Sequence, residues 1–218
     1  MATIHYIKSG SGNLSGPSNA SRGQTITVTA TPAQGYSIAS FNVTGGSYSQ
    51  ISAGRYSVYV NSDDVNITCT FSQVDYIVSC VKTPDAGGTI TANKGIAHFG
   101  DVITLTVTPA TGYRLKSLTE TPTLTITNSS FTMPASNVTV TATFEKINYT
   151  VSISKTPAEG GTVSLSKTSA NYGDEITVTA TPATGYQIKS ITTNPTATVT
   201  NKKFNMPAAN TAVTVVIA

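Results

Sequence analysis

The residues of this chain that could carry binding chemistry gather in one tyrosine-rich segment, residues 44–59. It contains Tyr48, Arg55, Tyr56 and Tyr59. Tyrosine and arginine are enriched in recognition surfaces, and aromatic rings also stack on sugars. We therefore expect these four residues to bind a partner protein or a glycan. The alternative is structural: Tyr56 and Tyr59 occupy strand positions, and Tyr48 covers the edge of a sheet.

The other polar residues give little support for catalysis or metal binding. His5 and His98 are the only histidines, and neither lies at a ligand or relay spacing from a cysteine or carboxylate. The acidic pair Asp63 and Asp64 lies in a segment without the alternating Asp and Gly of a calcium loop. We therefore expect no catalytic residue, no metal site, no cofactor and no enzymatic activity.

Two further aspartates recur at one position of a turn. Asp101 and Asp174 each follow a glycine, and Gln24 takes the equivalent place earlier in the chain. Because Asp side chains readily accept hydrogen bonds from nearby backbone groups, we expect these two to stabilise turns.

The elements that position these residues come from an internal repeat. The pattern Gly-(Gln/Asp)-x-Ile-Thr-x-Thr-x-Thr-Pro-Ala-x-Gly-Tyr occurs at residues 23–36, 100–113 and 173–186. Its spacing of 77 and then 73 residues corresponds to one small domain per repeat. The predicted domains are residues 1–73, 74–146 and 147–218.

The first repeat differs from the others within the tyrosine-rich segment. The stretch from Gly35 to Val58 is four residues longer than the equivalent stretch from Gly112 to Phe131. This insertion makes the first repeat the favoured binding repeat.

Alternation of apolar and polar residues predicts that each repeat is built from β-strands. In the third repeat, residues 175–181 place Ile176, Val178 and Ala180 on one face, and residues 197–200 form a further strand. No stretch has helical apolar spacing. Short strands separated by Gly and Pro turns indicate an all-β fold of three tandem small Ig-like or β-sandwich-type domains. Because the links between repeats are short, we expect an elongated array.

Composition excludes several classes of partner. Charged residues make up 11% of the chain, and the net charge of +3 comes without a Lys/Arg cluster, so we expect no nucleic-acid partner. No apolar run approaches the length of a membrane span. Cys69 and Cys80 take core-facing positions in different repeats, which predicts two buried free thiols.

A longer motif resembles a known family. The sequence Phe-Thr-Met-Pro-Ala-Ser-Asn-Val-Thr-Val-Thr-Ala-Thr-Phe at residues 131–144, preceded by the Gly-Asp to Gly-Tyr pattern, is similar to the divergent internalin-B-type B-repeat. The resemblance covers residues 76–218; the first repeat has Val58, Val60 and Asn61 where the others have Phe, Met and Pro. The chain also lacks the tryptophan that members often carry. The resemblance implies a non-catalytic spacer or adhesion module of bacterial surface and some phage proteins. It leaves a β-grasp-like repeat as an alternative fold.

These observations predict a non-enzymatic structural or interaction protein displayed on a surface. The absence of a signal peptide, the free thiols and the short array favour a phage virion decoration or fibre protein on the virion surface. Its partner would be a capsid or other virion protein. The alternative is an extracellular stalk or adhesion fragment of a bacterial cell-surface protein that binds host-surface glycans or proteins. Thr-rich edge strands also make a homo-oligomer an open expectation.

Overall fold

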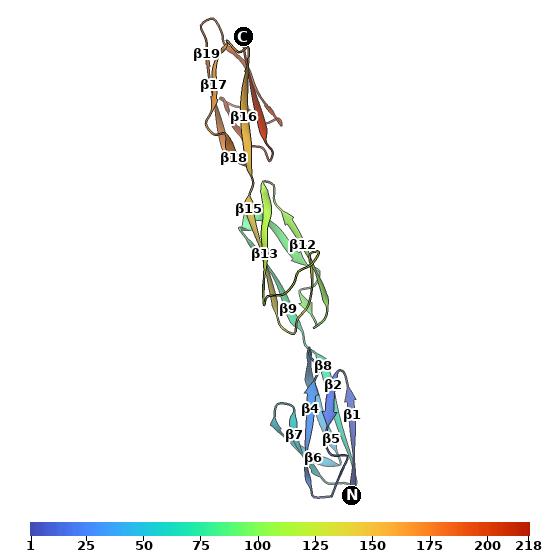
Figure 1. Ribbon diagram of the computed structural model, residues 1–218. Coiled ribbons are helices and arrows are strands. Elements are labelled where there is room, and N and C mark those ends of the chain that lie inside the picture. The colour runs from blue at the N-terminus through green and yellow to red at the C-terminus, as the bar shows by residue number, and fades with distance from the viewer. The chain divides into compact units, whose positions relative to one another are not determined.

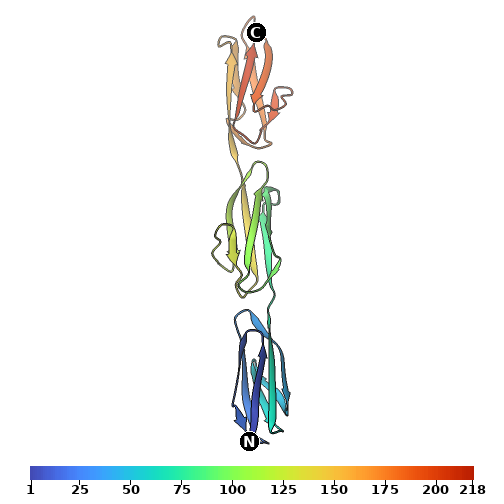
Figure 2. The ribbon, with the colours of Figure 1, turned by 90° about the vertical axis from the view of Figure 1, so that its right-hand side faces the viewer.

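The regular secondary structure of the protein is almost wholly β-strand in the computed structural model, which describes residues 1–218 (Figures 1 and 2). The strands form six small sheets, two in each of three tandem repeats. The one helical element is a single 3₁₀ turn, Asp85–Gly87, and no helix is long and apolar enough to cross a membrane. The predicted all-β fold of three tandem repeat domains is therefore confirmed.

The first repeat contains two four-stranded sheets. Its strands are β1 (Ala2–Ser9), β2 (Gly12–Ser15), β3 (Asn19–Ala20), β4 (Thr25–Pro32), β5 (Tyr36–Thr44), β6 (Gly46–Ser52), β7 (Arg55–Val60) and β8 (Asp64–Gln73). The sheet orders are β3-β1-β8-β5 and β2-β4-β7-β6. β1 and β8 pair in parallel, whereas all other neighbours are antiparallel.

Both sheets of the first repeat contribute to one hydrophobic core. Ile4, Ile67 and Phe71 come from one sheet, and Val28 and Val58 from the other. Two sheets facing a shared core, with no helix across either, make this repeat a sandwich and not the β-grasp-like alternative. Burial of these side chains is the main stabilising term, at about 25 cal/mol for each Å² removed from water.

The second and third repeats share a smaller version of this plan. The second contains β9 (Tyr76–Thr83), β10 (Gly88–Ala92), β11 (Ile96–Ala97), β12 (Val102–Pro109), β13 (Tyr113–Thr121), β14 (Ser130–Thr132) and β15 (Val138–Lys146). The third contains β16 (Asn148–Thr156), β17 (Gly161–Leu165), β18 (Ser169–Asn171), β19 (Glu175–Pro182), β20 (Ile188–Asn194), β21 (Lys203–Asn205) and β22 (Thr211–Ile217).

Each of these two repeats has one four-stranded and one three-stranded sheet. The orders are β11-β9-β15-β13 with β10-β12-β14, and β18-β16-β22-β20 with β17-β19-β21. Neither repeat has a strand in the place of β6. The first repeat therefore owes its extra edge strand to the insertion seen in the sequence.

Alternation accounts for most strands of the third repeat but not for all of its connections. Ile176, Val178 and Ala180 are buried on β19, as predicted. The strand predicted at residues 197–200 is wrong, because only Thr200 forms a bridge, to the residue that begins β21. A tight turn follows at once, so the segment has no length in which to build a ladder.

The turn position shared by Asp101, Asp174 and Gln24 has the role that the sequence predicts. In each case a side-chain oxygen accepts a hydrogen bond from the backbone N–H three residues earlier, at 3.1, 3.2 and 3.0 Å respectively. The same turn is therefore closed by a carboxylate in two repeats and by an amide in the first.

The two cysteines are free, and burial raises the pKa of both thiols. Cys69 is fully buried in the first core, as predicted. Cys80 shares a strand face with the buried Val78 but is only half-buried. A hollow of about 240 Å³, lined by Cys80, Lys82 and Ile90, opens beside it and admits solvent. The prediction of a buried thiol is therefore wrong for Cys80, which is free but only half-buried.

Candidate functional site

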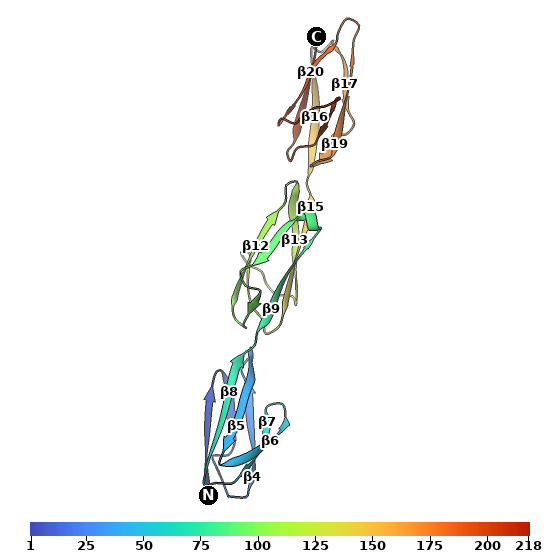
Figure 3. The same cartoon turned by 180° about the vertical axis from the view of Figure 1, so that it is seen from behind.

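The site is built on the hairpin formed by β6 and β7, which lies beside β4 and β5 in Figure 3. Ala53 and Gly54 form its turn, and the Gly54 carbonyl accepts a hydrogen bond from the Ala30 N–H at 2.8 Å. Gly54 has φ +71°, and a Cβ there would lie 2.5 Å from the Ala30 carbonyl oxygen. Glycine is therefore required for the hairpin tip to rest on β4.

The structure divides the four sequence-predicted residues between the two faces of this hairpin. Arg55 and Tyr59 point outward from β7 and are exposed, whereas Tyr56 points into the core with only 6% of its surface accessible. Tyr48 lies opposite Val58, on the inward side of β6, and is 43% exposed. The four side chains therefore do not form one continuous surface.

An aromatic cluster fixes β6 against β5. The rings of Phe41 and Tyr56 stack with centroids 3.6 Å apart and planes 5° apart. Tyr48 meets Phe41 edge-on at 5.2 Å, and its hydroxyl donates a hydrogen bond to the Phe41 carbonyl at 2.7 Å. Stacking and burial hold the Tyr56 ring in place, and burial raises the pKa of its hydroxyl. The Tyr56 ring is thus part of the core and not a contact surface.

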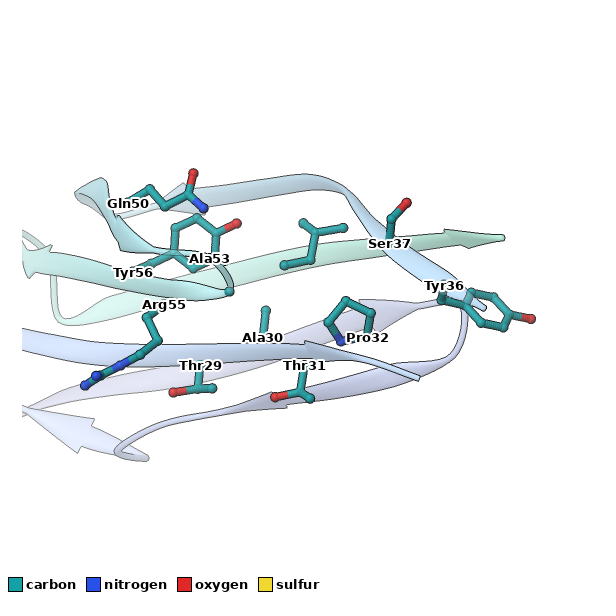
Figure 4. Close-up of a pocket in the computed structure, with 12 residues that line it drawn as sticks. Thr29, Ala30, Thr31, Pro32, Tyr36, Ser37, Gln50, Ala53, Arg55 and Tyr56 are labelled. Atoms are coloured by element: carbon teal, nitrogen blue, oxygen red, sulfur yellow. The ribbon is translucent and has the colours of Figure 1, made fainter. Parts of the chain in front are cut away.

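Beyond Tyr48, towards the hairpin turn, the two sheets enclose a groove (Figure 4). Its volume is about 710 Å³, within the range of ligand pockets in proteins. Apolar side chains from the end of β4, the start of β5 and the hairpin line it: Ala30, Pro32, Ile38 and Ala53. This groove is the candidate binding space of the first repeat.

The hydroxyl of Tyr56 points into this groove (Figure 4). The hydroxyls of Tyr6 and Tyr48 each donate to a backbone carbonyl, at 3.0 and 2.7 Å, whereas that of Tyr56 has no acceptor within the protein. No side-chain nitrogen or oxygen is both fully buried and without a partner, so this hydroxyl must reach the space of the groove. The groove thus has an apolar lining with one free hydrogen-bonding group.

Arg55 is the only charged residue among those that line the groove. Its guanidinium extends past Thr29, on the outer side of the strand, and makes no ion pair with another residue. No carboxylate lines the groove. A ligand that carries a negative charge near this rim would therefore meet an unneutralised cation.

The histidines have partners that sequence spacing did not reveal. His5 Nε2 lies 2.8 Å from Asp64 Oδ1, and His98 Nε2 lies 2.9 Å from Asp75 Oδ1. The parallel pairing of β1 with β8 places His5 opposite Asn66, two residues from Asp64, and so brings together positions far apart in the chain. Both pairs are exposed, and no third His, Cys, Asp or Glu joins them in a group that could hold a metal ion.

Sequence reasoning missed two residues of the site. Ile38 lines the groove, and Phe41 stacks on Tyr56. The available signal was the position of Phe41, which is aromatic where the other repeats have Leu118 and Ile191.

Comparison with known proteins gives one finding. A family model described as a divergent InlB B-repeat domain matches the chain three times, over residues 2–75, 78–148 and 149–216. These segments follow the three sandwiches and together span almost the whole chain. No curated protein matches it.

Proposed function

Because the chain belongs to the divergent InlB B-repeat family, a family of structural and adhesion repeats, we propose that it is displayed on a surface and binds a partner there through its first repeat. The family accounts for a non-enzymatic surface or structural module. The observation that carries the binding role is the β6–β7 hairpin with its groove, which the first repeat adds to the common plan.

The second and third repeats serve as spacers in this proposal. Their three-stranded sheets end at β14 and β21, strands of three residues each in the place of β7, and have no strand in the place of β6. The same sandwich therefore supports two roles. The second and third repeats act as spacers, and the first repeat contacts the partner.

In its more specific form, the proposal is that the protein is a decoration or fibre of a phage virion, docked through the first repeat on a capsid or other virion protein. The two free thiols support this form, since a protein assembled in a reducing cytoplasm keeps its cysteines unpaired. The second candidate is a stalk or adhesion segment of a bacterial cell-surface protein. The match to the InlB B-repeat favours this candidate.

Localisation tests both forms. Antibodies raised against the third repeat leave the groove free and would be applied, with gold labelling, to cells and to purified phage particles of the source. Label on the particles supports the virion form, and label on the outer face of the cells supports the stalk form. Label confined to the cell interior contradicts surface display altogether.

A further inference from the structure

The first repeat has sheet edges of a kind that proteins usually protect. An edge strand presents unpaired N–H and C=O groups to any other extended chain, and charged side chains are a common defence. β5 and β6 are edge strands of nine and seven residues without a single charge. The counterparts of β5 in the other repeats, β13 and β20, carry Arg114, Lys116, Glu120 and Lys189, and β6 has no counterpart there. Every other edge strand has five residues or fewer.

These two open edges lie on either side of the groove. β5 contributes Ile38 to its lining, and β6 contributes Gln50. Gln50 lies opposite Tyr56 in the β6–β7 ladder, so it shares the inward side of the sheet. A strand added beside β6 would place its own inward side chain level with Gln50. That side chain would point into the groove, towards the free hydroxyl of Tyr56.

The lining selects among the possible occupants. Ala30, Pro32 and Ile38 favour an apolar side chain, and the Tyr56 hydroxyl favours a hydrogen-bonding atom at its end. The unneutralised Arg55 favours an acidic residue close by in the same segment. A sugar fits less well, because the Tyr56 ring is stacked on Phe41 and offers no face for stacking.

A second copy of this chain also fits poorly. Paired with itself, β6 would offer Tyr48 and Gln50 as its inward side chains. The Tyr48 hydroxyl is already bonded to the Phe41 carbonyl at 2.7 Å, and Gln50 Nε2 donates to the Ser52 carbonyl at 3.2 Å. Neither side chain is apolar at its tip and free to fill the groove.

We infer that β6 accepts an extended segment of another protein as an added β-strand, with an apolar side chain of that segment in the groove and an acidic neighbour near Arg55. This mode combines main-chain pairing, which gives affinity, with one pocket, which gives selectivity. The inference rests on the proposed function, since it names the kind of partner that the first repeat binds.

The test is a selection from a displayed library of random 12-residue peptides on the immobilised full chain. The enriched peptides are then synthesised and added to the full chain, and hydrogen exchange is followed by mass spectrometry. We expect enriched peptides with alternating apolar residues and a carboxylate, which slow exchange in β6. Failure to enrich any peptide overturns the inference, as does an enriched peptide that protects other strands.

Three variants sharpen this test. Gln50→Lys places an inward charge on the edge and is expected to weaken peptide binding by more than ~10-fold. Asn13→Lys adds the same charge to β2, the opposite edge of the same sheet, and is expected to leave binding unchanged. Tyr56→Phe removes only the free hydroxyl and is expected to weaken binding by about 3- to 10-fold. Equal binding by Gln50→Lys and the unaltered chain would overturn the inference.

Two other outcomes also decide the question. Slow exchange in β6 without any peptide, together with a dimer in light scattering, would show that a second copy pairs there and would overturn the inference. A failed selection alongside surface labelling of particles or cells would remove strand addition but leave the proposed function intact.

Discussion

The first and third repeats differ in the connection that follows β5 in one and β20 in the other. In the third, the chain runs from β20 through an irregular segment and a two-residue turn, Asn201 and Lys202 at φ 50° and 61°, into the three-residue β21. In the first, the chain turns at Gly45 and forms the β6–β7 hairpin, paired from Gly46 with Val60 to Ser52 with Arg55. The rest of the two sandwiches follows one plan.

The difference shows where this fold tolerates change. Inward residues at the end of the connection are buried in both repeats: Val58 and Val60 in the first, Phe204 and Met206 in the third. In the third repeat the larger side chains fill this part of the core. In the first repeat smaller side chains fill it together with the stacked rings of Phe41 and Tyr56. Four added residues create an edge strand and a groove while the core stays closed.

The largest expected effect concerns the independence of the repeats. Tyr56→Ala removes the stack on Phe41 and leaves a cavity, so the first repeat should lose about 3–5 kcal/mol of unfolding free energy. Phe204→Ala should cost the third repeat a similar amount. Hydrogen exchange of the full chain under denaturant reports each repeat separately. Simultaneous loss of protection in all three repeats would show that they unfold as one unit.

The two turns should respond in opposite ways to a change of residue. Gly54→Ala forces a side chain into φ +71° and against the Ala30 carbonyl, which should cost about 1–3 kcal/mol. Asn201→Gly relaxes a position that already has positive φ, and its effect should stay within about 0.5 kcal/mol. Chemical denaturation with exchange readout measures both. A neutral Gly54→Ala would mean that the hairpin tip does not rest on β4.

Two hydroxyl deletions separate a structural tyrosine from one available to a ligand. Tyr48→Phe removes the bond to the Phe41 carbonyl and should cost about 1 kcal/mol. Tyr56→Phe should leave stability unchanged, since its hydroxyl makes no bond within the protein. Thermal unfolding of both variants checks this pair. If Tyr56→Phe proved the more destabilising, the hydroxyl would have a partner inside the sandwich.

The smallest expected effect is a difference in acid sensitivity between equivalent turns. The Lys94 ammonium, 2.8 Å away, and the His98 backbone N–H lower the pKa of Asp101. Because its pKa is lowered in the folded state, the Asp101 carboxylate stabilises the second repeat at pH values above its unfolded-state pKa of about 3.9. This stabilisation is lost as the pH falls through the folded-state pKa. Asp101→Asn should therefore flatten the acid limb of the second repeat's stability curve.

The first repeat supplies the internal control for that experiment. Its equivalent turn is closed by the uncharged Gln24, which accepts the Ser21 N–H at 3.0 Å. Exchange in this turn should not change between pH 4 and pH 2 on account of that side chain. Equal acid sensitivity of the two turns in the unaltered chain would contradict the role of the Asp101 carboxylate.

The sequence allowed the strands to be predicted because alternation is a local property. The burial of Tyr56 could also have been predicted, because Tyr56 alternates with outward residues along β7 in the same way as Val58 and Val60. The expectation of a four-residue binding surface treated these tyrosines by residue type and passed over that phase. Tyr59, one step out of phase, is the exposed one.

The groove could not be predicted in the same way. Its lining comes from β4, β5 and the hairpin, so it depends on how the β6–β7 register meets the other sheet. Ile38 belongs to it only because the hairpin tip rests on Ala30. The His5–Asp64 contact was missed for the same reason, since it arises from strands at opposite ends of one repeat.

The parallel pairing of the entering and leaving strands in the first and third repeats has a mechanical consequence. Thr3 to Ser9 of the strand that enters the first repeat run beside Asp64 to Thr70 of the strand that leaves it, and β16 and β22 repeat this arrangement. A pull on the two ends of such a repeat acts along both strands in opposite senses. It therefore loads the hydrogen bonds of the ladder in shear, all together, and does not peel them apart one at a time. A tether made of these repeats would bear tension until the whole ladder fails.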